Sequence, residues 1–204
     1  MKLFQVGGSP FVRKVLVVAH ETGLIDKLEL LDGGTTPIKT NPELAKFNPV
    51  GKIPALILAD GTGLANSPVI CDYLDSQHRG VKMIPASGPS RWEALHFQAI
   101  SDGLMDAAVN NRYETMVRPE ALRWDAWSTS QMGKADRVVD ALEGSAENLG
   151  DRVDIGTISI GCALGYLDYR YGDRNWRSSH SKLAAWFAKF EQLPSMQATM
   201  PPKV

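Results

Sequence analysis

The stretch Ser9-Pro10-Phe11-Val12 joins a short apolar run, 3–6, to an amphipathic segment, 11–22, and it reads as a helix start. Serine caps the first turn of a helix, and proline occupies that turn without losing a hydrogen bond. The unsatisfied N–H groups of a helix N-terminus favour an anion, and a thiolate is an anion. The turn therefore predicts that the Ser9 hydroxyl lies where a bound thiol can ionise. A plain helix cap is the alternative interpretation.

Outward from this turn, short strands and helices alternate. Strands are predicted over 3–6, 28–31 and 55–58, the last in a hairpin around Asp60-Gly61. Helices are predicted over 11–22 and 41–47, and from Ser67 onward. The order βαβαββα predicts a small mixed sheet in a domain of residues 1–79. Residues 80–89 contain two prolines and two glycines, which is typical of a linker.

Residues 90–204 show helical patterns only. Leu183, Trp186, Phe187 and Phe190 recur at the spacing of one helix face. The apolar run 155–167 predicts a central helix buried on most sides. Asp154 before it and Thr157 at its third position predict a capping box with exchanged residue types. We expect an all-α domain here.

Composition excludes several classes of function. The chain has 204 residues, with 22 basic and 23 acidic side chains, so it lacks the positive charge typical of nucleic-acid binding. Its apolar runs are too short to span a membrane, and no signal peptide is evident. Cys71 and Cys162 form no CxxC pair, and the four histidines are scattered, so no metal site is predicted. We expect a soluble, cytoplasmic protein.

Several segments together resemble the glutathione S-transferases common in bacteria. The residues 9–14 resemble the first βα turn of that family, and 48–56 resemble its cis-proline loop. Residues 66–70 resemble the acidic-Ser motif that opens its third helix, and 162–170 its buried C-terminal helix. The tail 194–201 also fits. The resemblance implies an α/β thioredoxin-like domain followed by an all-α domain, in a homodimer.

The resemblance implies that the chain conjugates the glutathione thiolate to a small hydrophobic electrophile. Thioredoxin-like redox proteins carry two thiols in the first turn, where this chain has Ser9 and Val12. Disulfide exchange by a protein thiol is therefore not expected. Two other functions stay open: a glutathione- or partner-binding protein without efficient turnover, and a glutathione-dependent reductase or peroxidase that uses only the thiol of glutathione.

Pro54 is predicted to follow a cis peptide bond. This bond would turn the Ile53 backbone toward the cleft, where glutathione could pair with it as an added strand. A trans proline at the start of an edge strand is the alternative. Lys52 is a candidate partner of the glycyl carboxylate, or else an exposed surface lysine.

Asn66 and Ser67 form the third element of the predicted glutathione site. Ser67-Pro68 repeats the Ser-Pro pattern of a capped helix start, whose N–H groups can bind the γ-glutamyl carboxylate. Asn66 stands where the family usually has Glu or Asp facing the ligand's ammonium group. The resemblance implies that Asp102, from the partner subunit, can supply the missing charge. The alternatives are a simple cap for Ser67 and a solvated acidic face for Asp102.

An acceptor pocket is predicted from Phe11 and from Met105, Val109 and Tyr113, which step along one helical face. Such a stripe is also typical of a helix core. The sequence does not identify the electrophile.

Overall fold

The computed structural model describes residues 1–203, which form two compact units. The N-terminal unit consists of Met1–Arg91 together with the C-terminal segment from Pro194. The helical unit consists of Trp92–Leu193.

The predicted βαβαββα order is confirmed in the N-terminal unit. A 3₁₀ turn, Ile25–Lys27, which the sequence did not indicate, follows the first helix. The elements are β1 (Lys2–Gln5), α1 (Pro10–Glu21), β2 (Glu29–Asp32), α2 (Pro42–Ala45), β3 (Ala55–Ile57), β4 (Gly63–Ala65) and α3 (Ser67–Ser76).

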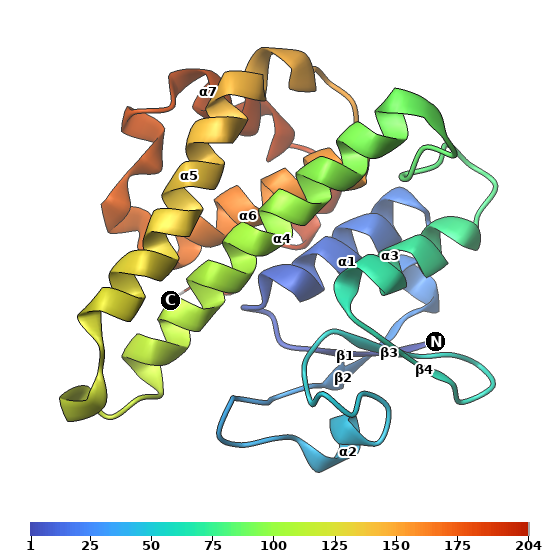
Figure 1. Ribbon diagram of the computed structural model, residues 1–204. Coiled ribbons are helices and arrows are strands. Elements are labelled where there is room, and N and C mark those ends of the chain that lie inside the picture. Colours follow the sequence, from blue (N-terminus) through green and yellow to red (C-terminus); the bar gives the residue numbers. More distant parts are fainter. Residues whose placement is uncertain (204) are drawn as a thin grey trace. The chain divides into compact units, whose positions relative to one another are not determined.

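The four strands form one sheet in the order β2-β1-β3-β4. Strand β1 runs parallel to β2, with Leu3 opposite Leu30, and antiparallel to β3, with Leu3 opposite Leu56. Helices α1 and α3 lie side by side on one face of the sheet, and α2 lies on the other (Figure 1). A small core on the α2 side contains Phe4, Leu44, Ala55 and Ile57.

Helix α1 ends where the sequence predicts. Its buried face includes Val12, Val15 and Val18, and Gly23 follows with a φ of +68°. This left-handed conformation is one that glycine adopts without a steric penalty, so the chain turns here into the 3₁₀ turn.

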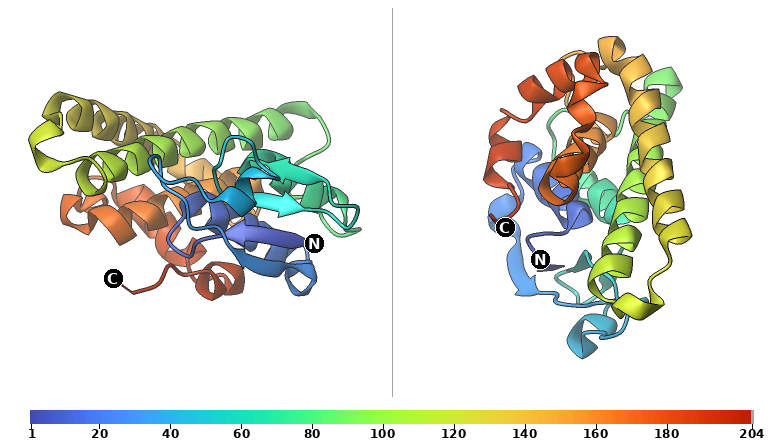
Figure 2. Two further views of the ribbon diagram at one scale, coloured as in Figure 1. Left: turned by 90° about the horizontal axis from the view of Figure 1, so that it is seen from below. Right: turned by 90° about the vertical axis from the view of Figure 1, so that its left-hand side faces the viewer.

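The helical unit contains α4 (Gly88–Met116) from Trp92 onward and the whole of α5 (Asp125–Leu149), two long helices that Figure 2 shows from two further sides. They are followed by α6 (Ile155–Tyr171) and α7 (Ser181–Phe190), with 3₁₀ turns at Glu120–Leu122, Gly172–Arg174 and Trp176–Ser178. Residues 155–167 of α6 are all buried, as expected of a central helix. The predicted capping box is present: Thr157 N–H donates to Asp154 at 3.0 Å, and Asp154 N–H donates to Thr157 at 3.0 Å.

The structure differs from the expected domain boundary at the C-terminus. The short helix α8 (Pro194–Ala198) belongs to the N-terminal unit, because it packs on α1 and the Arg13 guanidinium donates to the Met196 carbonyl oxygen at 3.1 Å. Helix α4 also begins at Gly88, inside the segment predicted to be a linker. Among the described helices, none is both long enough and apolar enough to cross a membrane.

Candidate functional site

Ser9 is the N-cap of α1. Its backbone is extended, and its Oγ accepts a hydrogen bond from the Val12 N–H at 3.4 Å, a long distance for such a bond. A hydroxyl that accepts a bond still has its own hydrogen to donate. No described group accepts that hydrogen, and the Ser9 side chain is only half-buried. Ser9 therefore serves as a cap and can still donate to an anion at the helix end.

The first turn holds no protein thiol. Cys71 and Cys162 are both buried, in α3 and α6, and neither is at the α1 N-terminus. Any sulfur chemistry at this helix end needs a thiol from a ligand.

The peptide bond between Ile53 and Pro54 is cis, as predicted from the cis-proline loop. The Ile53 side chain packs against the small core on the α2 side. Among residues 1–203, no group is hydrogen-bonded to the Ile53 N–H or C=O. The Ile53 backbone can thus accept a hydrogen bond from an extended peptide and donate one to it.

Asn48 holds the loop before Pro54 in place, a role that sequence reasoning missed. Its buried side chain accepts from the Val50 N–H at 3.1 Å and donates to the Lys52 carbonyl oxygen at 2.6 Å. Gly51 has a φ of +67° and donates to the Asn48 carbonyl oxygen. The Asn-Pro-x-Gly sequence is a turn signal that could have indicated this brace. Lys52 itself is exposed.

The start of α3 differs from the prediction. Ser67 is the first helical residue, and Asn66 stands in the N-cap position, so the expectation that Ser67 caps the helix was wrong. The Asn66 side chain makes no cap bond either. Asn66 has a φ of 74°, a conformation that residues other than glycine rarely adopt. The positive φ shifts the helix start by one residue from the Ser-Pro pattern.

The Ser67 hydroxyl is fully buried and has no hydrogen-bond partner among the described residues. Buried polar groups are paired in the great majority of cases, so each exception calls for an explanation. The N–H groups of the first turn of α3 are also donors without intrahelical acceptors. Together they form a compact set of donors for an anionic ligand.

The remaining predicted residues lie in different environments. Phe11, Val109 and Tyr113 are half-buried, whereas Met105 is fully buried in the core of the helical unit. Asp102 is half-buried on α4. Burial raises the pKa of the Tyr113 hydroxyl.

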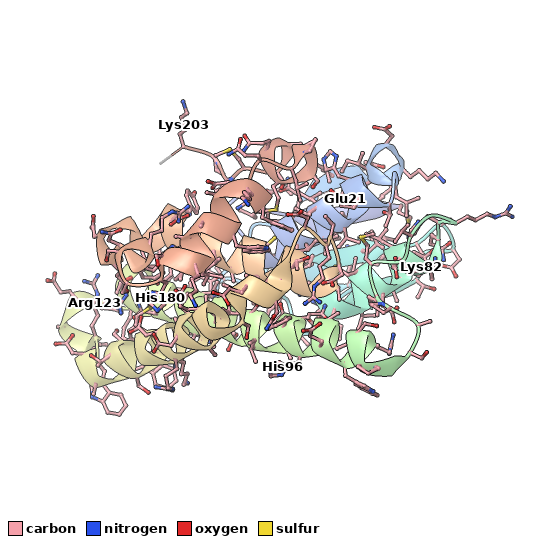
Figure 3. All side chains as sticks on the ribbon, turned by 90° about the horizontal axis from the view of Figure 1, so that it is seen from above. Glu21, Lys82, His96, Arg123, His180 and Lys203 are labelled. Atoms are coloured by element: carbon pink, nitrogen blue, oxygen red, sulfur yellow. The ribbon has the colours of Figure 1, made fainter. Side chains whose placement is uncertain are left out.

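The helical unit also has a cavity of about 260 Å³, walled by Leu167, Tyr171 and Trp176 among others. His180, labelled in Figure 3, lies at this cavity directly before α7. Its Nδ1 lies 2.8 Å from the Trp176 carbonyl oxygen, and its Nε2 lies 2.8 Å from a carboxylate oxygen of Asp140. Both partners are acceptors, so the geometry favours protonation of both ring nitrogens.

The pKa of His180 agrees with that geometry. Burial alone lowers it, but the hydrogen bonds to Asp140 and to the Trp176 carbonyl, with the charges of Asp140 and Glu143, raise it above its usual value. Arg174 at the same cavity is paired with Asp136 at 2.7 Å. Because these charges are already paired, the cavity does not require a charged ligand. In the described part of the chain, no group of three or more His, Cys, Asp or Glu side chains is placed to hold a metal ion.

Two family models match the sequence. The model described as "Glutathione S-transferase, N-terminal domain" matches residues 8–77, and "Glutathione S-transferase, C-terminal domain" matches residues 125–189. A curated relative, the "Uncharacterized GST-like protein YibF" of Escherichia coli K12, is 31% identical over 206 residues. The match covers 100% of this chain and 100% of the relative.

Solved structures extend the likeness over both units. A glutathione transferase family member from Pseudomonas fluorescens Pf-5, crystallised with bound glutathione, is 44% identical. Its TM-score is 0.96, and the match covers 98% of each chain. A second structure described in the same terms, with bound S-(propanoic acid)-glutathione, has a TM-score of 0.91 and covers 99% of this chain and 100% of the other.

Proposed function

Because this chain belongs to the glutathione S-transferase family, we propose that it joins the thiolate of glutathione to a small electrophile. The observation that carries the proposal is the Ser9 hydroxyl, which caps α1 and still has its hydrogen to donate. The thiolate sulfur attacks the electrophilic carbon and forms the S–C bond. The leaving group, or the displaced π electrons, takes the charge, and the thiol proton passes to solvent.

The expected fall in the pKa of the bound thiol is large enough to ionise it at neutral pH. A charge-assisted hydrogen bond contributes about 1.5–3 kcal/mol, and a helix N-terminus about 0.3–1 kcal/mol more. Together they lower the pKa of a thiol from about 8.5 by roughly 1.5–3 units. At pH 7 about half of the bound thiol is then ionised at the smaller shift, and nearly all of it at the larger shift.

The N-terminal unit offers matching contacts for the rest of glutathione. The Ile53 backbone pairs with the peptide, and Lys52 meets the glycyl carboxylate. The Ser67 hydroxyl and the first turn of α3 bind the γ-glutamyl carboxylate, while Asn66 accepts from the ammonium group. The bound glutathione in the Pseudomonas fluorescens relative, 44% identical, supports this assignment.

We also propose a homodimer in which Asp102 of one subunit supplements the neutral Asn66 of the other. Sedimentation at assay concentration tests it: a fully active monomer would exclude the idea. The proposed setting is cytoplasmic detoxification, where glutathione is reduced.

The test of the main proposal is turnover against electrophiles of several classes, among them an aryl halide, an epoxide and an α,β-unsaturated carbonyl compound. The wild type should turn over at least one class, and Ser9→Ala should lose most of that rate while retaining glutathione binding. Equal rates in both proteins would remove Ser9 from the mechanism.

The specific observation that favours a second function is Asn66, whose exposed amide brings no charge to the ligand's ammonium. In this alternative, the protein binds glutathione and turns over no electrophile. Calorimetric binding of glutathione together with zero turnover across the panel would favour it over the main proposal.

A further inference from the structure

The chain after α8 packs back onto the N-terminal unit, at the loop that carries Ser9. Residues 199–203, which we call the brace, follow α8 and belong to the same unit as α1. The Pro202 ring lies against Gly7, because a β-carbon at that glycine would be only 3.4 Å from the Pro202 Cδ. Gly7 lies two residues before Ser9, in the connection between β1 and α1. The brace thus contacts the loop 6–9, which leads to the proposed thiolate donor.

The loop 6–9 is only weakly held by its own residues. Gly7 and Gly8 are adjacent, and glycine has more backbone freedom than any other residue. A single backbone hydrogen bond closes the turn, from the Ser9 N–H to the Val6 carbonyl oxygen at 3.0 Å. Val6 and Gly7 are both exposed, so core packing contributes little at this point. A loop of this kind samples several conformations unless another segment restricts it.

The brace is anchored where it begins. Met196 of α8 is fully buried, and its carbonyl oxygen accepts from the Arg13 guanidinium at 3.1 Å. Arg13 lies in α1, and its backbone N–H donates to the Ser9 carbonyl oxygen at 3.0 Å. The Thr199 hydroxyl donates to the Ser195 carbonyl oxygen at 2.8 Å, which ties the start of the brace to α8. One end of the brace is therefore fixed to the helix that Ser9 caps.

The brace is also stiff. Pro201 and Pro202 are consecutive, and each pyrrolidine ring fixes its own φ at about −65°. A proline also restricts the residue before it, so Met200 and Pro201 have few conformations available. Such a segment loses less conformational entropy on ordering than a flexible one does. A stiff segment that starts at α8 and contacts Gly7 can therefore restrict the loop without a large entropy loss of its own.

We propose that Pro202 is a positioning residue for the proposed reaction: by holding the loop 6–9, the brace keeps the Ser9 hydroxyl directed at the sulfur of bound glutathione. The inference rests on the proposed function and deepens it by adding a residue that acts through Ser9. A hydrogen bond weakens steeply when its length or angle leaves the preferred range. A small displacement of the loop therefore weakens ionisation of the thiol, while the peptide contacts of glutathione remain.

A brace with a purely structural role would give a different result. Its loss would lower the unfolding temperature and leave the pKa of the bound thiol unchanged. A brace that positions Ser9 changes that pKa, because the ionised thiol depends on the Ser9 hydrogen bond more than the neutral thiol does. The pKa of the bound thiol is therefore the measurement that separates the two roles.

The experiment replaces Pro202 by glycine in the otherwise unchanged chain, which removes the ring and frees the backbone. Thiolate absorbance against pH should show that the pKa of bound glutathione is about half a unit higher in Pro202→Gly than in the wild type. At a pH below that pKa, the ionised fraction and the turnover should fall about threefold. Without ligand, hydrogen exchange at the Gly8 and Ser9 amides should become faster, since it reports local opening of the loop.

Gly7→Ala tests the same contact from the side of the loop. Gly7 has no positive φ, and a β-carbon 3.4 Å from Pro202 makes an ordinary van der Waals contact, so alanine fits there. Alanine has less backbone freedom than glycine. Combined with Pro202→Gly, it should therefore lower the thiol pKa part of the way back to the wild-type value. A purely structural brace predicts no such recovery.

Two controls accompany Pro202→Gly. Pro119→Gly makes the same change at an exposed proline of the helical unit, so it matches the effect on the unfolded chain. Lys203→Ala removes the charge next to Pro202, on an exposed side chain that points into solvent (Figure 3). Both variants should keep the wild-type thiol pKa and turnover. A shift in Lys203→Ala as large as that in Pro202→Gly would mean that the chain end acts through its charge, and it would overturn the positioning role.

The outcomes distinguish this inference from the proposed function. An unchanged thiol pKa in Pro202→Gly, with glutathione still bound and turned over, overturns the positioning role and leaves glutathione conjugation standing. A wild-type protein that binds no glutathione, or binds it without ionising its thiol, contradicts the proposed function, and the positioning role fails with it.

Discussion

The helices of the two units begin in different ways. In the helical unit, α6 starts with the capping box of Asp154 and Thr157. Helix α7 receives its cap from another helix, because the Glu143 carboxylate of α5 accepts from the N–H groups of Lys182 and Leu183 at 3.2 and 2.8 Å. In the N-terminal unit, α3 starts with no side-chain cap and with a buried hydroxyl, that of Ser67, left without a partner.

Helix α1 lies between these extremes. Ser9 caps it, but through a bond of 3.4 Å and with the hydroxyl hydrogen still available. Ser9-Pro10 and Ser67-Pro68 are the same dipeptide, but Ser9 is the N-cap of α1, whereas Ser67 is already the first helical residue of α3. Where a helix N-terminus has only a structural role, side chains accept hydrogen bonds from its N–H groups. Where it binds a ligand, some of these donors stay available for the ligand.

The largest effect is expected for Ser9→Ala. Loss of one charge-assisted donor, worth about 1.5–3 kcal/mol, should raise the pKa of bound glutathione by roughly 1–2 units and slow turnover about 10- to 100-fold at neutral pH. Glutathione affinity should change less, because the Ile53 and Ser67 contacts remain. Thiolate absorbance against pH measures the shift.

Ser9→Thr is the matched control, since it keeps a hydroxyl at the cap and should restore most of the shift. An unchanged thiol titration in Ser9→Ala would mean that Ser9 is an ordinary helix cap. The start of α1 would then have only a structural role, like the start of α6.

Ser67→Ala should weaken glutathione binding about tenfold without lowering stability. The buried hydroxyl has no partner in the protein, so its removal costs no internal hydrogen bond. Calorimetry and thermal unfolding measure the two effects. Ser76→Ala, at the exposed end of the same helix, should leave the affinity unchanged. A marked loss of stability in Ser67→Ala would mean that the α3 start serves the fold.

Glu143→Ala should give the opposite pattern. It removes the cap of α7 and should reduce the free energy of unfolding by about 1–2 kcal/mol, as other cap deletions do. Glutathione affinity should not change. Glu147→Ala, which removes the exposed ion pair with Lys182, is the control and should lower the stability less than Glu143→Ala does, because surface ion pairs contribute little. Chemical denaturation compares the two variants. Equal stability of both variants would show that α7 does not depend on its distant cap.

The sequence indicated most of the N-terminal unit and the start of α6, because local signals act there. Ser9-Pro10 and Asp60-Gly61 in the N-terminal unit, and the Asp154 capping box in the helical unit, each fix a turn or a helix end within four residues, and the structure has all of them. The start of α3 was misplaced because Asn66 adopts a positive φ that no pattern of residue types signals.

The Glu143 cap was missed for a different reason. Glu143 and Leu183 are 40 positions apart. Such pairs meet only when helices pack, so periodicity along one segment cannot reveal them. The position of α8 in the N-terminal unit depends likewise on a contact between Arg13 and Met196, far apart in sequence.

The smallest effect is expected for Asn66→Asp, which leaves the α3 start open and changes only its charge. Asp tolerates the left-handed region as Asn does, so the backbone should stay as it is. The carboxylate would replace a neutral acceptor for the γ-glutamyl ammonium, and charge-assisted bonds are roughly twice as strong as neutral ones. Binding should tighten by about 1 kcal/mol, or several-fold, in a calorimetric titration with glutathione.

The same titration in Asp102→Ala completes the test. If Asp102 of the partner subunit already supplies the charge, Asn66→Asp should gain little in the wild-type background and clearly more once Asp102 is removed. If Asn66→Asp gains nothing in either background, the ammonium group does not lie at Asn66. The open start of α3 would then bind an anion alone, and glutathione would not be the ligand for which this helix end is shaped.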